Sequence, residues 1–237
     1  MFGLGTLINT GAIIAAGIIG SLFGHHLKQR HQETVMVAAG ISVMFIGISG
    51  TMEGMLSLSD GKLSSGQAML LVLSMTIGGL IGEWLGIEDG FERLGYWLQE
   101  KSGNANDNQF VSAFVTASLT VCIGAMGIVG AIQDGILRDP SILITKAILD
   151  FIIILVMASS LGKGAGFSAI PVLCFQGFIT LLAQFIKPMM TEVALANISL
   201  VGSVLIFCVG LNLVFGQKVR LANLLPALLI AVLIAYI

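Results

Sequence analysis

Long apolar stretches without any charged side chain constrain the fold of this chain more than any other feature. Residues 151–161 and 197–216 contain no Asp, Glu, Lys or Arg. Apolar runs near 20 residues match a hydrocarbon core that is ~30 Å thick. Only 10% of the 237 residues are charged, whereas soluble domains carry about 25%. The sequence therefore predicts an all-α integral membrane protein, with the lipid bilayer as its first partner.

Polar breaks divide the apolar residues into about eight expected transmembrane helices, which would form one polytopic membrane domain over residues 1–237. The expected spans cover residues 3–24, 34–51, 67–85, 110–133, 141–161, 166–186, 196–215 and 221–237.

A ninth helix is expected between the third and fourth spans, where apolar residues recur at helical spacing and charged residues fill the other face. Tyr96 and Trp97 there suit the headgroup level. We expect one interfacial amphipathic helix at this point; a solvated loop helix is the alternative.

The basic residues of the short loops predict the orientation of the spans. The loops after the first, third, fifth and seventh spans hold seven Lys and Arg residues, and the opposite loops hold three. The richer side should be cytoplasmic. An even number of spans would then place both termini outside the cell, in the periplasmic or extracellular space.

Two apolar segments resemble each other and suggest an internal repeat. Residues 40–49 (GISVMFIGIS) are similar to residues 202–212 (GSVLIFCVGLN), and an Ala-led apolar run follows each. The repeat halves would be residues 1–86 and 166–237, with 110–161 between them. An offset of five spans would invert one three-helix copy, as in many secondary transporters. The alternative is a chance likeness between two glycine-dotted apolar helices.

The fourth span combines glycines with polar residues. Gly124, Gly127 and Gly130 follow each other at three-residue spacing, and Thr116 precedes them. Glycine weakens a helix, and an opened helix must lie in protein or beside water. Such breaks form substrate sites in transporters; close helix packing is the alternative. At the eighth span, Asn223 and Pro226 could likewise expose backbone groups, unless Pro226 lies in a first helical turn.

Ionisable residues at membrane depth are the strongest functional signals, because burying them costs several kcal/mol. Asp150 lies near the middle of the fifth span, with Lys146 one helical turn before it. They predict either a structural ion pair, with Lys146 reaching outward, or a site sensitive to protons or cations. Asp134 ends the glycine-rich span, at a vestibule or deeper. Asn9 lies within the first span.

The sequence lacks the residues that several other functions would require. A net charge of −2 gives no footprint for nucleic acid. All three histidines lie in the loop after the first span, so no haem ligand or catalytic pair is expected at membrane depth. No metal site, cofactor or phosphate-binding loop is predicted, and we do not expect an enzyme.

Three motifs together resemble a known family. They are GTLINT at residues 5–10, FVTASL at 114–119 running into GAIQDG at 130–135, and RLANLLP at 220–226. The chain resembles the bacterial inner-membrane family known as domain of unknown function 554, the YqgA- and YdfK-like proteins. The resemblance covers essentially the whole chain and implies a multi-pass protein of the bacterial inner membrane. It implies no catalytic or binding residues.

The leading functional hypothesis is a transporter for a small solute or ion, coupled to protons or cations. Its pathway would be lined by Asn9, Thr116, Asp134, Asp150 and Asn223. A passive channel, oligomeric through GxxxG faces such as Gly20–Gly24, is the first alternative. A membrane scaffold or regulatory protein without transport is the second.

Overall fold

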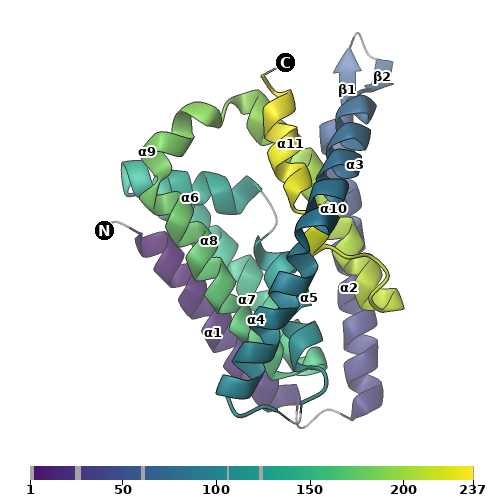
Figure 1. The fold of residues 1–237 in the computed structure, drawn as a ribbon, viewed down its shortest axis with the longest axis vertical. Coiled ribbons are helices and arrows are strands. Elements are labelled where there is room, and N and C mark those ends of the chain that lie inside the picture. The colour runs from purple at the N-terminus through teal and green to yellow at the C-terminus, as the bar shows by residue number, and fades with distance from the viewer. Residues whose placement is uncertain (1–2, 25–27, 60–61, 106, 123–124, 237) are drawn as a thin grey trace. The chain divides into compact units, whose positions relative to one another are not determined.

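The fold is helical, as the apolar pattern predicts (Figure 1). The computed structural model describes residues 3–24, 28–59, 62–105, 107–122 and 125–236. Its elements are α1 (Leu4–Gly24), α2 (Gln29–Met55), β1 (Leu56–Ser59), β2 (Lys62–Ser65), α3 (Ala68–Leu85), α4 (Ile87–Lys101), α5 (Phe110–Cys122), α6 (Ala125–Leu137), α7 (Ser141–Leu161), η1 (Lys163–Ser168), α8 (Ala169–Leu181), α9 (Ala183–Ile186), η2 (Lys187–Met189), α10 (Glu192–Phe215), η3 (Ala222–Leu224) and α11 (Pro226–Ile234).

The predicted count of eight spans is not confirmed. Within the described residues, six helices are long and apolar enough to cross a membrane, and the bent pair α5–α6 would make seven. The expected eighth span corresponds to η3 and α11, a shorter apolar segment. Pro226 is at the first turn of α11, so it ends no helix there. The outward position of both termini depends on an even count and stays a prediction.

The segments between the long helices differ from the expectation in part. The polar break after α2 contains an antiparallel hairpin, in which Leu56 pairs with Ser65 and Ser59 with Lys62. Helix α4 forms where the amphipathic pattern predicts it, although its depth in a bilayer stays a prediction. Of the three loop histidines, His31 lies in the first turn of α2, whereas His25 and His26 fall outside the described residues.

The chain divides into two compact units, which are not the predicted repeat halves. The first contains residues 1–39 and 89–187, and the second contains residues 40–88 and 188–237. Each unit combines segments that are distant in sequence. The inverted repeat itself stays a prediction.

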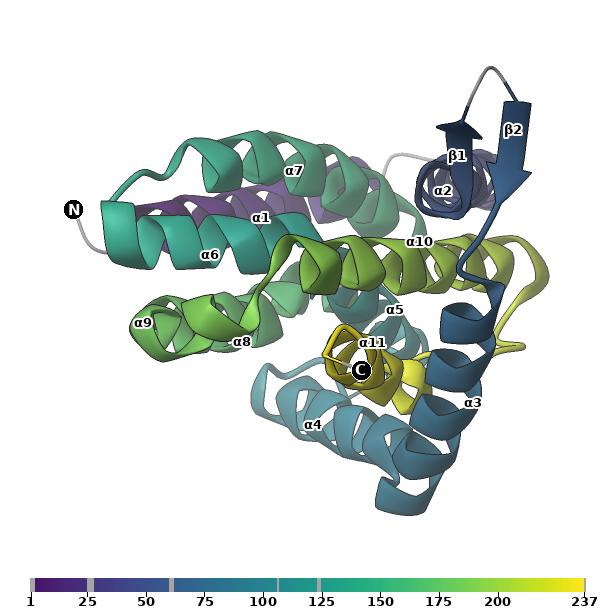
Figure 2. The same ribbon diagram turned by 90° about the horizontal axis from the view of Figure 1, so that it is seen from above.

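In the first unit, α1, α6, α7 and α8 lie side by side (Figure 2). Helices α1 and α7 are parallel, because Gly5 lies against Leu143 and Gly24 lies against Ser159. Helix α8 runs antiparallel to α1, since Thr6 contacts Thr180 near the start of α1 and Gly17 meets Gly166 further along. Glycine makes these contacts close, as expected for helices that associate in lipid.

Because α1 and α7 are parallel, both would cross the membrane in the same direction. The chain between them must then cross the membrane an odd number of times. Helices α2 and α3 are both long enough to cross and provide two, whereas α4 is not among the candidate spans. Helices α5 and α6, which are inclined by 63°, must then provide the third. The parallel direction of α1 and α7 thus fits one broken span better than a re-entrant loop.

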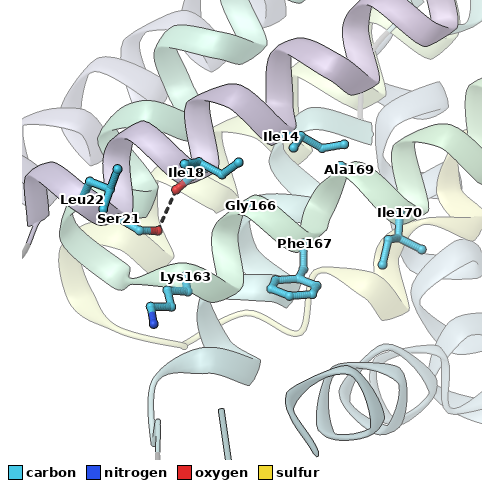
Figure 3. A pocket seen from close by; sticks show the side chains of 10 residues that line it. Ile14, Ile18, Ser21, Leu22, Lys163, Gly166, Phe167, Ala169 and Ile170 are labelled. Atoms are coloured by element: carbon cyan, nitrogen blue, oxygen red, sulfur yellow. Dashed lines mark hydrogen bonds between the residues drawn. The ribbon is translucent and has the colours of Figure 1, made fainter. Parts of the chain in front are cut away.

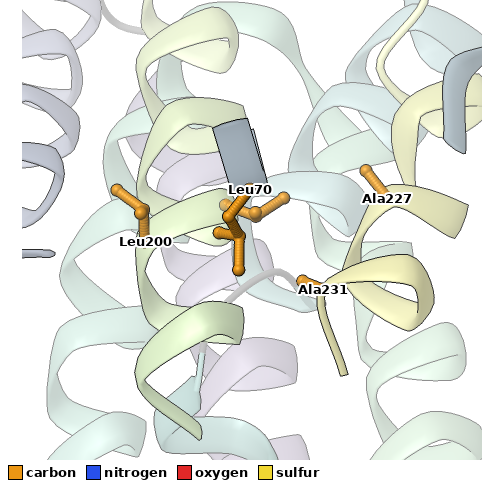
Figure 4. Close-up of a cluster of buried hydrophobic side chains, with 5 residues drawn as sticks. Leu70, Leu200, Ala227 and Ala231 are labelled. Atoms are coloured by element: carbon orange, nitrogen blue, oxygen red, sulfur yellow. The ribbon is translucent and has the colours of Figure 1, made fainter. Parts of the chain in front are cut away.

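In the second unit, glycines also bring helices together. Gly40, Gly47 and Gly54 recur every seven residues on α2, and an added Cβ at each would come within 3 Å of α10 atoms. A small apolar core joins α10 to two further helices, α3 and α11 (Figure 4). Leu70 of α3 and Leu200 of α10 meet Ala231 of α11 there.

We predict that Gly20→Ala destabilises the protein, whereas Gly11→Ala on the same helix does not. A Cβ at Gly20 would lie 2.5 Å from the Leu155 carbonyl oxygen of α7, but one at Gly11 meets nothing within 4 Å. Overpacking of this kind costs roughly 1–3 kcal/mol. The measurement is the thermal unfolding midpoint of each purified variant in detergent. Equal midpoints for the two variants would contradict the close α1–α7 contact.

Candidate functional site

A buried ion pair lies at the centre of the first unit. The Lys146 Nζ atom is 2.8 Å from both carboxylate oxygens of Asp150, one turn further along α7. The two residues are only 7% and 3% exposed. Helix α7 has 21 residues and is about 32 Å long, and Asp150 lies roughly 14 Å from its start. The ion pair, one of the two alternatives predicted, is present near the middle of α7, but Lys146 is buried and does not reach outward.

Lys146 instead turns toward the broken span. Its ammonium donates to the Val121 carbonyl oxygen at 2.9 Å. Helix α5 ends at Cys122, so this carbonyl belongs to the last turn, where no intrahelical donor is available. The predicted interruption of the span coincides with the bend between α5 and α6, although Gly124 itself lies outside the described residues. The lysine thus satisfies a backbone acceptor that the break leaves open.

Asn9 connects α1 to this pair. Its side-chain amide donates to Asp150 Oδ2 at 3.0 Å and to Gln176 Oε1 of α8 at 3.2 Å. Asn9 is fully buried, and Gln176 is 1% exposed. Gly127 of α6 lies over the cluster, since a Cβ there would be 3.4 Å from the Lys146 side chain. Five helices therefore contribute to one polar cluster.

Asp134 lies at the start of α1, about one helical turn from Asn9, and is counted with this cluster although it bonds none of its other side chains in the described residues. Its Oδ2 accepts the Gly5 backbone N–H at 2.9 Å and the Thr6 N–H at 3.4 Å. These N–H groups have no partner inside the helix, and the positive end of the helix dipole favours a carboxylate. Asp134 is fully buried, so the open vestibule considered for it is wrong. The Thr6 and Thr180 hydroxyls meet beside it at 3.2 Å.

The buried charges do not balance within this cluster. It contains two carboxylates, Asp134 and Asp150, and one ammonium, Lys146, which gives a formal charge of −1. Two of its buried acceptor atoms, Asp134 Oδ1 and Asn9 Oδ1, have no donor among the described residues. Unsatisfied buried acceptors cost about 1–3 kcal/mol each. The arrangement favours a bound proton or cation over an anion.

The other two predicted site residues are not joined to this cluster by any hydrogen bond in the described structure. Thr116 is buried on α5, where its carbonyl accepts the Thr120 hydroxyl at 2.7 Å. Asn223 belongs to the second unit. Its contact with a solute stays a prediction, as does that of Thr116.

Asn223 is part of a polar clamp in the second unit. Its amide donates to Glu83 Oε2, and its Oδ1 accepts the Glu88 backbone N–H, both at 2.7 Å. The Glu88 carboxylate accepts the Ala222 N–H at 2.7 Å, and Arg220 pairs with Glu83. Both ends of the Asn223 amide are thereby engaged in joining α3 to the start of η3.

The loop between α6 and α7 is ordered by Asp139. Its carboxylate accepts the Ser141 hydroxyl and backbone N–H, and it also accepts the Gln133 amide at 2.6 Å. Because these donors stabilise the charged form, the pKa of Asp139 lies below its usual value. Asp139 is partly exposed, whereas Asp134 five residues earlier is buried.

Sequence reasoning identified Asn9, Asp134, Asp150 and their neighbour Lys146, but not how they connect. Gln176 is a single polar residue in an apolar run, which by itself indicates no particular role. The Val121 carbonyl carries no sequence signal at all, because every residue has one. Contacts such as Asn9 to Gln176 join positions 167 residues apart, which a local pattern cannot reveal.

Comparison with known proteins identifies the relatives of this chain. The family described as "Protein of unknown function (DUF554)" matches residues 4–236. The chain belongs to this family. It is 32% identical to the membrane protein YdfK of Bacillus subtilis (strain 168), covering 98% of this chain and 96% of that protein. It is 30% identical to YqgA of Escherichia coli (strain K12), covering 96% and 94%. No solved structure matches it significantly.

The resemblance found in the three motifs is therefore confirmed, and membership of this family agrees with the apolar helices of the structure. A multi-pass protein in a membrane follows from both. All five predicted site residues lie within the matched region.

We predict that replacing one partner of the buried ion pair lowers the free energy of unfolding far more than its share of the loss when both partners are replaced. Lys146→Met or Asp150→Leu alone leaves an unpaired charge in a dry interior, which costs about 3–5 kcal/mol. The double variant should be more stable than the two single losses added together. Free energies of unfolding from a denaturant titration in mixed micelles would give the coupling.

The matched control is the exposed pair of Glu83 and Arg220. Their side chains are 58% and 69% exposed, so Arg220→Gln should cost less than about 1 kcal/mol through the charge contact. Additive losses at Lys146 and Asp150 would show that the pair is not desolvated.

Proposed function

We propose that this protein is a membrane transporter for a small solute or ion, coupled to protons or cations. The observation that carries the proposal is the buried cluster around Asp150 and Asp134, with its formal charge of −1 and its two acceptor atoms without donors. Ionisable groups at mid-span depth are costly and typically mark ion pathways.

The cluster supplies the parts that a coupled site needs. Asp150 can exchange its partner, because a proton or cation on its carboxylate would weaken the contact with Lys146. Lys146 in turn holds the carbonyl end of the broken α5. Loading Asp150 would therefore change the set of partners that holds Lys146 at the end of α5, beside the break between α5 and α6. Broken helices that border a binding site are the moving parts of many transporters.

The two carboxylates, from α6 and α7, accept hydrogen bonds from successive turns of α1. Asp134 caps the helix at Gly5 and Thr6, and Asp150 accepts from Asn9, about one helical turn further. By the predicted orientation, α1 and α7 begin on the outer side. Asp134 would then be the first acidic group that a cation meets, and Asp150 the second.

The test is charge movement in proteoliposomes on a solid-supported membrane, under separate proton, sodium, potassium and chloride gradients. We predict a current with a proton or cation gradient, and at least a roughly tenfold loss in Asp150→Asn, since the charge contact removed is worth more than 1.4 kcal/mol. Asp134→Asn should reduce the current as well. Asp150→Glu, which keeps the charge, should retain part of it.

The matched control is Asp89→Asn, which removes an exposed carboxylate of α4 with the same change in charge. Saturation of the current and its block by an opposing gradient would identify a carrier, whereas a linear response would favour the passive channel. A current that both site variants leave unchanged would remove the aspartates from the pathway. No current and no solute uptake in any gradient would favour a scaffold or regulatory protein.

A further inference from the structure

A groove on the first unit continues from an apolar part into a polar part. The apolar part has a volume of about 530 Å³ and lies between α1 on one side and η1 with α8 on the other (Figure 3). Ile14, Ile18 and Leu22 form one wall, and Phe167 and Ile170 form the other. Ser21 and Lys163 line this part and also a polar cavity of about 310 Å³. The two cavities therefore adjoin.

The polar cavity lies where the spans end. Its walls include Gly24, the last residue of α1, and Leu161, the last residue of α7. From Leu22 to Ile14 the apolar groove follows nine residues of α1, a rise of about 12 Å along the helix. Half of a ~30 Å hydrocarbon core is about 15 Å. The groove thus extends from the membrane boundary into one leaflet.

One positively charged and one negatively charged side chain line the polar cavity. Lys163 brings an ammonium, and Asp107 brings a carboxylate whose Oδ1 accepts the Gln109 N–H. Asp107 is close to the residue before Lys163, because a Cβ on Gly162 would lie 3.7 Å from Asp107 Oδ2. Neither charge has an ion-pair partner among the described residues. Ser160 adds a buried hydroxyl without a partner there.

We propose that this groove binds one phospholipid with a zwitterionic headgroup that carries a primary ammonium, of the phosphatidylethanolamine class. One acyl chain would lie in the apolar groove. The phosphate would contact the Lys163 ammonium and the Ser160 hydroxyl, whereas the Ser21 hydroxyl already donates to the Gly17 carbonyl oxygen. The headgroup ammonium would contact Asp107. An anionic headgroup would match Lys163 but be repelled by Asp107. A quaternary ammonium would match the charge of Asp107 but offer no N–H for its oxygens.

The site is separate from the cluster of the proposed transport function. None of its lining residues belongs to that cluster, and neither Asp134 nor Asp150 lies in the walls of the two cavities. Lipid binding can therefore be present or absent whatever the protein transports.

The experiment is native mass spectrometry of the full-length protein, released from micelles that contain equal amounts of phosphatidylethanolamine, phosphatidylglycerol and phosphatidylcholine with identical acyl chains. We expect one phosphatidylethanolamine to be retained in preference to the other two. Lys163→Gln should reduce its retention by roughly fivefold, the size expected for a partly exposed charge contact. Asp107→Asn should reduce the preference over phosphatidylcholine by a similar factor.

A groove-filling variant tests the acyl chain. Ile18 is 58% exposed in the groove, and Ile148 is 60% exposed on α7 outside it. Ile18→Trp should abolish the retained lipid, whereas Ile148→Trp should leave it in place. Unchanged retention in Ile18→Trp would overturn the site. Equal retention of the three lipids, or a preference for phosphatidylglycerol, would overturn the headgroup assignment.

Discussion

The first unit depends on one electrostatic constraint, which is the cost of keeping charge away from water. Lys146 and Asp150 lie at mid-span depth, where a lone ion of either sign would cost several kcal/mol. Each therefore needs partners from other helices: the Val121 carbonyl for the ammonium and the Asn9 amide for the carboxylate. These bonds link α1, α5 and α7, so the arrangement of three helices depends on where two charges can be satisfied.

Close helix packing makes this arrangement feasible. The polar side chains of α1 are short, so α1 must approach α7 and α8 closely for Asn9 to reach both Asp150 and Gln176. Glycines at positions 5, 17 and 20 allow that approach, since a Cβ at any of them would clash with α7 or η1. The α1 glycines therefore allow the hydrogen bonds of the polar cluster to form. A change in either would move the carboxylates relative to the helix start that Asp134 caps.

The break between α5 and α6 gives Lys146 one of its hydrogen-bond acceptors. An unbroken α5 would satisfy its own carbonyl groups, and Lys146 would lose one of its partners. With the break, the lysine divides its hydrogen bonds between a helix end and a carboxylate. Such a shared donor responds to whatever neutralises the carboxylate. The proposed coupling would act through this shared donor.

The sequence by itself determined the membrane class and most of the apolar helices, because run length is a local property, and three motifs indicated the family. It offered the ion pair of Lys146 and Asp150 as one of two alternatives, from their i,i+4 spacing. Its count of about eight spans is not confirmed, since Pro226 begins a short helix where length alone suggested a span. It also missed the hairpin after α2, which is too short and polar for a strand pattern. Only the tertiary structure decided that Asn9, Gln176 and the Val121 carbonyl meet at Asp150, and that Asn223 belongs to another unit. Those contacts depend on helices distant in sequence approaching closely, and no local pattern encodes which helices will do so.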